Sequence, residues 1–451
     1  MRLSEQQFDV RLLAGGKPVL ESLVRALDLE SSQGEAPLRF VVTASDGQHY
    51  RCEIGVQTGG ARMPASIFDF VPRSHESVDS FNAVMLVPTG IGAEIGGHAG
   101  DATPAAKLLA SVCDTLITHP NVLNASDIIS IPHNALYVEG SVISRLLMGT
   151  VGLRKVRNNR VLVAVQDHKE EMFTNSAINA VNAARASYGL VCPRVIRLDQ
   201  GFEMGSLYTA SGRASGEVRG MDGLLAALER YRPDYDAVAI SSIITVPESY
   251  HRDYFASAGA MINPWGGVEA LLTHALSSSY NVPTAHSPML ESQDIANMDV
   301  GVVDPRMAAE VVSLTFFLSV LRGLQQSPAI VDAPVEMREP GVLTARDISC
   351  LVIPDGCIGL PTLAALEQGI PVIAVRENRN LMQNDLSALP WSSGQLHFAE
   401  NYWEAAGVLA ALKTGIAPRS ARRPFTSVET ENAEGRGPLA TRELATRLAT
   451  F

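Results

Sequence analysis

Short apolar runs alternate with longer stretches of helical periodicity along most of the chain. Runs of β-branched and other apolar residues predict strands at 83–87, 115–118, 161–166, 194–198, 237–244, 282–285, 350–353 and 371–375. Apolar residues recur at helical spacing in 104–112, 175–188, 224–231, 268–278, 306–325 and 361–368. Apolar strands that alternate with helices are typical of βαβ units. We therefore predict an α/β fold with mostly parallel, Rossmann-like sheets flanked by helices.

The first 75 residues have a different pattern. Leu38–Thr43 and Tyr50–Val56 are extended runs separated by Asp46-Gly47, a dipeptide that favours a tight hairpin turn. Periodicity is weak again near the C-terminus. We predict a small β-containing appendage at 1–75, a catalytic or ligand-binding α/β unit at 76–416 that can divide into two lobes, and a partly mobile tail at 417–451.

Composition narrows the class of protein. Apolar residues make up 46% of the 451 positions and charged residues 19%, which excludes a disordered chain. The 36 basic and 48 acidic side chains give a net charge of −12 with no basic run, which argues against binding to nucleic acid.

Cysteine use and hydropathy bear on the compartment. Five cysteines without a CxxC pair fit a reducing environment. Residues 1–13 show no apolar signal segment, and no stretch reaches the roughly 20 apolar residues of a membrane span. We expect a cytoplasmic protein that does not bind a membrane, with a small-molecule substrate and homodimeric assembly.

A glycine-rich loop follows the strand predicted at 83–87. Residues 88–101 hold five glycines, which permit positive φ angles and close approach of the backbone to a ligand. A helix begins directly afterwards, and its free N–H groups favour an anion. We expect the loop to bind a substrate carboxylate or phosphate, although it matches neither a Walker loop nor GxGxxG; the alternative is a tight turn that packs helix on sheet. The residues expected to bind substrate are Thr89, Gly90, Gly96, Gly97, His98, Gly100, Asn121, Asn263 and Thr362.

Histidines follow predicted strands at three places, His119, His168 and His286. Because imidazole titrates near neutral pH, we predict that these residues and Asp101 act in acid–base catalysis. Each also has an ordinary alternative: a hydrogen-bonded structural histidine or, for Asp101, a helix cap.

Cys357 lies between glycines 356 and 359 in a predicted strand-to-helix turn. A helix N-terminus stabilises a thiolate, so Cys357 is a candidate nucleophile, and the alternative is a small buried cysteine.

No cofactor motif is evident, and no HxH or HxxxH spacing is present. A divalent metal therefore needs donors from distant segments, of which we consider His119, Asp167, His168 and His286.

Three segments together carry a resemblance: PTGIGAEIGGHAGD at 88–101, LITHPNVLN at 116–124 and PHNALYVEG at 132–140. In this order they resemble an uncharacterised bacterial and plastid domain-of-unknown-function family, over roughly Val84 to Val375. The resemblance implies one evolutionary unit over this range, and it implies no activity.

These features favour an enzyme that acts on a small polar or anionic metabolite through histidine and cysteine chemistry, namely acyl or amide hydrolysis, cyclisation or isomerisation. One alternative is a nucleotide-sugar transferase or epimerase, because residues 361–378 are similar to the C-terminal half of those enzymes, which places Thr362 and Glu367 at the nucleotide. Another is a non-catalytic protein that binds a small molecule or serves as a scaffold.

Overall fold

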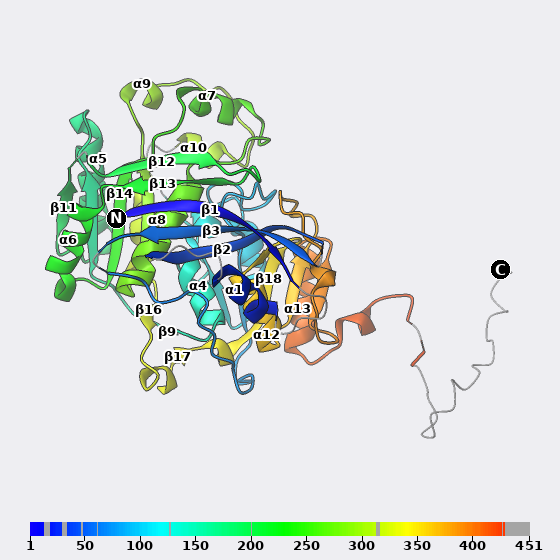
Figure 1. The fold of residues 1–451 in the computed structure, drawn as a ribbon. Coiled ribbons are helices and arrows are strands. Elements are labelled where there is room, and N and C mark those ends of the chain that lie inside the picture. The colour runs from blue at the N-terminus through cyan, green and yellow to red at the C-terminus, as the bar shows by residue number, and fades with distance from the viewer. Residues whose placement is uncertain are drawn as a thin grey trace. The chain divides into compact units, whose positions relative to one another are not determined.

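The structure is a computed structural model that describes residues 1–12, 19–28, 34–46, 48–60, 62–125, 128–199, 201–312, 316–425 and 427–428 (Figure 1). Met1–Ala410 form one compact unit, and the second unit begins at Ala411. The three large sheets described next belong to the first unit.

One parallel sheet has six strands in the order β8-β5-β4-β18-β20-β21. The strands are β4 (Asn82–Met85), β5 (Thr115–Thr118), β8 (Ala135–Tyr137), β18 (Ile348–Pro354), β20 (Val372–Val375) and β21 (Leu396–Ala399). Numbered by their succession along the chain they run 3-2-1-4-5-6, which is the order of a doubly wound sheet. The helices that follow strands of this sheet along the chain are α2 (Thr103–Ala110), α4 (Gly140–Leu147), α12 (Leu360–Gln368) and α13 (Tyr402–Lys413).

A second parallel sheet comes from chain inserted between the two halves of the first. Its order is β11-β10-β14-β15, with β10 (Val161–Gln166), β11 (Val195–Leu198), β14 (Ala237–Ile243) and β15 (Thr284–Met289). The accompanying helices are α5 (Glu171–Tyr188), α6 (Asp222–Arg230), α8 (Gly266–Tyr280) and α11 (Phe317–Gln325). Every residue of β10 is buried, as expected for a parallel strand covered on both faces. The two sheets confirm the predicted fold class.

The third large sheet is antiparallel and non-local. Its order is β12-β13-β1-β3-β2-β19, with β1 (Arg2–Arg11), β2 (Glu35–Ser45), β3 (His49–Thr58), β12 (Glu203–Tyr208), β13 (Ala214–Arg219) and β19 (Ile358–Gly359). In Figure 1 the first five of these lie side by side. The N-terminal strands, which the sequence suggested as an appendage, therefore share a sheet with segments from the middle and end of the unit. The boundary predicted at residue 75 stays a prediction.

Smaller elements complete the unit. They are α1 (Val19–Asp28), α3 (Pro120–Leu123), α7 (Glu248–Ala256), α9 (Gln293–Ala296), α10 (Ala308–Val312), β6 (Asn124–Ala125), β7 (Ile128–Ile129), β9 (Gly152–Arg154), β16 (Ala329–Val331) and β17 (Val342–Leu343).

Two predictions need comment. The helix expected over 306–325 is present as α10 and α11, with residues 313–315 outside the described residues. The mobility expected of the C-terminal tail concerns residues that are mostly outside the described ranges. Within those ranges, no helix combines the length and apolarity that crossing a bilayer requires.

A buried ion cluster joins the N-terminal strands to α8. Glu5 pairs with Arg39 and Arg213, and Arg213 Nε also donates to Glu53 Oε2 at 2.8 Å. Arg39 Nη1 donates to the carbonyl of Gly267 at 3.0 Å, in the first turn of α8. The cluster thus connects the antiparallel sheet to the helix that carries part of the site.

Candidate functional site

A cavity of about 260 Å³ is lined by the carboxyl ends of both parallel sheets. Thr89 and His119 follow β4 and β5, while His286 and Met289 lie on β15 of the other sheet. Helix α8 contributes Trp265, its N-cap residue, and Glu269 of its first turn. Ligands of open α/β sheets bind outside the carboxyl ends of the strands, so this cavity is where binding is expected.

On one side of the cavity a histidine connects a serine to a carboxylate. His286 Nδ1 lies 2.8 Å from Glu269 Oε1, and His286 Nε2 lies 2.8 Å from Ser242 Oγ. Ser242 is on β14, the neighbour of β15, and is fully buried away from the cavity lining. The Glu269 side chain is 25% exposed. The connectivity is that of a serine triad, but the group that reaches the cavity is the carboxylate and not the hydroxyl.

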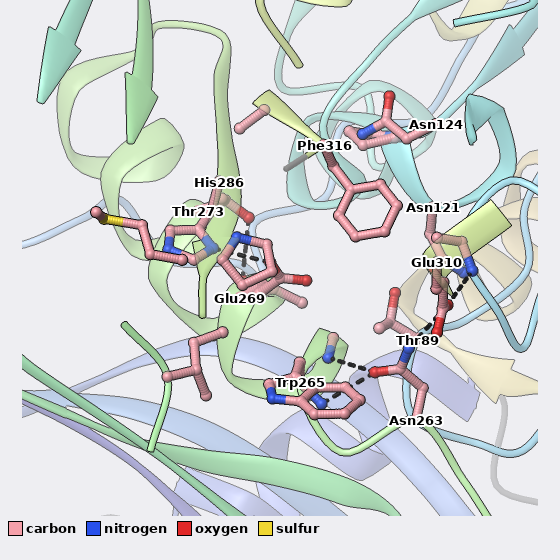
Figure 2. Close-up of a pocket in the computed structure, with 18 of the residues that line it drawn as sticks. Thr89, Asn121, Asn124, Asn263, Trp265, Glu269, Thr273, His286, Glu310 and Phe316 are labelled. Atoms are coloured by element: carbon pink, nitrogen blue, oxygen red, sulfur yellow. Dashed lines mark hydrogen bonds and ion pairs between the residues drawn. The ribbon is translucent and has the colours of Figure 1, made fainter. Parts of the chain in front are cut away.

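On another side Glu310 of α10 is held by groups from three segments (Figure 2). Its Oε1 accepts hydrogen bonds from the backbone N–H of Ala99 at 2.7 Å and from Asn263 Nδ2 at 3.2 Å. Burial raises the pKa of Glu310 to about 7, against the hydrogen bonds from Ala99, Tyr254 and Asn263 and with the help of nearby Asp101. Glu310 can therefore both hold and release a proton near neutral pH.

A buried tyrosine extends from Glu310 to His98. The Tyr254 hydroxyl interacts with Glu310 and lies 2.6 Å from His98 Nδ1. Burial, with Arg306 nearby, lowers the pKa of His98 to about 4, so its imidazole is neutral. The three side chains form a continuous path along which hydrogen bonds can rearrange when Glu310 changes protonation.

A second carboxylate–histidine pair lies at the start of α4. Glu139 Oε1 is 2.5 Å from His274 Nδ1 and accepts a hydrogen bond from Thr273 Oγ1 at 3.2 Å. Burial raises the pKa of Glu139, but His274 and the hydrogen bonds from Ser141 outweigh it and leave the pKa below its ordinary value.

His119 is fixed as a hydrogen-bond acceptor. Its Nε2 accepts from the backbone N–H of Val87 at 3.1 Å, which leaves the proton on Nδ1. Burial lowers its pKa to about 4 against the opposing charge of Glu139, so His119 is neutral. It lines the cavity, as do Thr89 and the Glu139–His274 pair.

The glycine-rich loop cradles anions that belong to the protein itself. Gly96 N donates to both carboxylate oxygens of Asp101 at 3.0 Å, His98 N donates to the same group at 3.3 Å, and Ala99 N donates to Glu310. Burial raises the pKa of Asp101 to about 6 against these backbone hydrogen bonds. The donors expected to bind a substrate anion are thus occupied by side chains of this chain.

Two of the expected binding residues support that loop. Asn121 Nδ2 donates to the carbonyl of Gly96 at 2.6 Å. Asn263 Oδ1 accepts from the backbone N–H of Trp265 at 3.0 Å and of Gly266 at 3.2 Å, and so satisfies the start of α8. Both also line the cavity, where Figure 2 shows them on the same side as Thr89 and Glu310.

Cys357 and Thr362 lie at a smaller cavity of about 130 Å³, between the ends of β4 and β18 where the strand order reverses. Phe40 and Val41 of β2 line its other side. Burial raises the pKa of the Cys357 thiol, which is only 4% exposed, and Thr362 Oγ1 donates to the Cys357 carbonyl at 2.8 Å. This environment does not favour a thiolate.

His168 lies apart from the main cavity lining. Its Nδ1 accepts from Glu170 N at 2.8 Å, and its Nε2 is 3.1 Å from the carbonyl of Leu290. The neighbouring Asp167 forms an exposed ion pair with Arg197 at 2.5 Å. Among the residues that the structure describes, no group of three or more His, Cys, Asp or Glu is placed to hold a metal ion.

The structure thus brings together part of the predicted set. Of the expected site residues, the main cavity is lined by Thr89, His119, Asn121, Asn263 and His286. Those that do not line it are Gly90, Gly96, Gly97, His98, Gly100, Asp101, His168, Cys357 and Thr362.

Among the other residues of the cavity, Glu139, Trp265, His274 and Glu310 were not selected from the sequence. Glu139 carried a usable signal, because it stands between a strand and a Gly-initiated helix in YVEG. Glu310 carried none of its own, since its environment is made by residues 99, 254 and 263.

Residues 82–422 match the model of a family described as "Protein of unknown function (DUF3326)". The chain is also 32% identical over 345 residues to an uncharacterised lipoprotein of Synechococcus sp., an alignment that covers 75% of this chain and 92% of that relative. These findings confirm the resemblance to an uncharacterised family. The expected cytoplasmic location stays a prediction.

Proposed function

This chain belongs to the DUF3326 family of proteins of unknown function, and we propose that it is an enzyme that catalyses proton transfer on a small polar molecule bound in the main cavity. Glu269 and Glu310 are the proposed acid and base. The reaction is an isomerisation, or a hydrolysis or cyclisation in which a carboxylate activates the attacking oxygen.

One observation carries the proposal: two glutamates with different surroundings line the same cavity. Glu269 Oε1 lies 2.8 Å from His286 Nδ1, and the structure describes no partner for Glu269 Oε2. Glu310 is enclosed, with a pKa raised by burial to about 7. Paired carboxyl groups in unlike environments are how enzymes divide acid and base roles.

We assign proton abstraction to Glu269 and proton donation to Glu310. His286 Nδ1 contacts the Glu269 carboxyl group, and Ser242 Oγ contacts His286 Nε2, so the ring is held from both sides. Trp265 and Phe316 form walls of the cavity (Figure 2).

The proposal requires no covalent intermediate. Cys357 lies at the other cavity with a raised thiol pKa, and Ser242 is sealed beneath His286. Neither has the access that a nucleophile needs.

The nucleotide-sugar alternative has less support. Its expected site is the cavity of about 130 Å³ at the strand reversal, about half the volume of the main cavity. Glu367, expected at the nucleotide, accepts a hydrogen bond from the backbone N–H of Val19 at 3.0 Å.

A conversion assay tests the proposal. Purified protein is incubated with fractionated bacterial metabolite extract in D₂O, and changes in mass features are followed by liquid chromatography and mass spectrometry. We expect wild type to consume a feature, and Glu310→Gln and Glu269→Gln to do so at least about 100-fold more slowly. Glu203→Gln, which changes an exposed carboxylate on β12, is the control and should match wild type.

Two outcomes contradict the proposal. Equal rates in wild type and both cavity variants exclude Glu269 and Glu310 as the acid and base. A feature that wild type binds and never converts favours the non-catalytic binding protein instead.

A further inference from the structure

We infer that the main cavity selects a ligand in which a ring carries a short, positively charged nitrogen substituent, and that it rejects carboxylates and phosphates. This inference rests on the proposed function, because it names the substrate class of the same site. It reverses the sequence-based expectation of an anionic group.

The first argument is the charge of the lining. Three carboxyl groups line the cavity, Glu139, Glu269 and Glu310, and no lysine or arginine is among its described lining residues. Two of the lining histidines, His274 and His286, already contact Glu139 and Glu269, and burial keeps His119 neutral with a pKa of about 4. An anion bound here would lose its hydration without gaining an opposite charge.

The second argument is that the natural anion-binding groups are already used. The N–H groups of Gly96 and His98 donate to Asp101, and that of Ala99 donates to Glu310. The start of α8 is satisfied by Asn263 Oδ1. The loop and helix end nearest the cavity therefore have few free donors for a substrate phosphate.

The third argument is that acceptor atoms remain on the cavity lining, beside the Nδ1–H donor of His119. The structure describes no hydrogen bond to Glu269 Oε2, and the buried Asn124 Oδ1 has no partner within the described residues. Both residues line the cavity. A ligand that donates N–H bonds would satisfy them.

The fourth argument is shape. Phe255, Trp265 and Phe316 line the cavity and are only partly buried. Trp265 is held edge-on by Tyr254, with ring centroids 5.2 Å apart, and lies 5.5 Å from the His251 ring. Aromatic faces attract cations. Since a cavity of about 150 Å³ holds benzene, one of about 260 Å³ has room for a ring with a short charged substituent.

Three probes of one size but different charge test this inference: benzylammonium, benzyl alcohol and benzoate. Binding to the full chain is measured by calorimetry at pH 8. We expect benzylammonium to bind at least roughly tenfold more tightly than benzoate, the difference that one charge-assisted hydrogen bond gives. Glu310→Gln should weaken benzylammonium roughly tenfold and leave benzyl alcohol unchanged, and Glu203→Gln should change neither.

A pH series on wild type avoids dependence on any variant. The titratable groups that face Glu310 are Asp101 and Tyr254, with His98 behind the tyrosine. Between pH 6 and pH 8 Glu310 loses its proton, so benzylammonium should bind more tightly at the higher pH while benzyl alcohol does not. Asp101 titrates in the same direction.

The inference is overturned if benzoate binds as tightly as benzylammonium, or if no probe binds. Such a result leaves the catalytic proposal intact provided that Glu310→Gln and Glu269→Gln still abolish conversion in the extract assay. Equal conversion by those variants would instead remove the catalytic proposal and leave the charge selectivity standing.

Discussion

Replacing Glu5 by Gln should destabilise the protein by several kcal/mol, although Glu5 is remote in sequence from every cavity residue. Glu5 is 3% exposed and contacts Arg39, Arg213 and the hydroxyl of Ser215. The variant keeps the size of the side chain but removes the negative charge that balances two buried guanidinium groups. Removing one member of a buried ion pair costs roughly 3–5 kcal/mol.

The pKa of Glu5 gives an independent magnitude. Burial raises it, but Arg39 and Arg213 outweigh burial and bring the pKa of Glu5 from 4.5 to about 2. At 1.36 kcal/mol per unit, that lowering corresponds to about 3 kcal/mol of stability at pH 7. A lowered carboxyl pKa contributes stability above the unfolded value, and the contribution is lost as pH falls from about 4.5 to about 2. The difference between wild type and Glu5→Gln should narrow over that interval.

Urea and thermal unfolding, followed by far-UV circular dichroism at pH 7 and at several acid pH values, measure this difference. For a unit of this size, about 3 kcal/mol corresponds to a melting temperature lower by roughly 3–4 °C. Glu203→Gln, on β12 of the same sheet and exposed, should stay within about 0.5 kcal/mol of wild type. The reasoning is refuted if the two variants unfold alike at pH 7, or if the gap widens at acid pH.

Three further predictions concern the site and its loop. Ser242→Ala should retain at least a tenth of turnover while losing roughly 1–3 kcal/mol of stability, because the serine orients His286 without attacking substrate; a thousandfold loss of turnover would instead mark it as a nucleophile. Cys357→Ala should keep wild-type turnover, and iodoacetamide at pH 8 should label the partly exposed Cys192 before Cys357, as peptide mass spectrometry can determine. Gly97→Ala should lower the melting temperature, because a Cβ there would lie 2.1 Å from the Ala93 carbonyl oxygen. Gly407→Ala is its control, since that position in α13 is open and alanine favours a helix, and equal melting temperatures for the two variants would contradict the steric argument.

The parallel strands could be predicted closely from sequence, and the antiparallel ones only in part. Strands such as β5 and β10 are buried on both faces, so each reads as a short apolar run with clear ends. Residues 2–11 of β1 are mostly polar, and they form a strand because β3 and β13 pair with them. Partners so distant in sequence leave no local pattern.

The residues of the candidate site also could be predicted from the sequence only in part. His119 could be selected because it directly follows β5, whereas His286, expected after a strand at 282–285, lies within β15. The raised pKa of Glu310 could not be predicted, because it results from burial beside Ala99, Tyr254 and Asn263, which are distant in sequence. For the glycine-rich loop, the sequence indicated backbone N–H groups that donate to carboxyl groups. It did not indicate that those carboxyl groups are Asp101 and Glu310 of the chain itself.

The pairing of β1 with β13, and of β4 with β18, also determines when each sheet can be completed during synthesis. At roughly 5–20 residues per second, the ribosome needs roughly 10–40 s after β1 to deliver β13, and roughly 15–50 s after β4 to deliver β18. During these intervals the emerging chain carries strand edges that have no native neighbour and that other chains can pair with. Slower accumulation of the protein, or a chaperone that shields those edges, should therefore raise the yield of correctly folded molecules more than any change within the finished core.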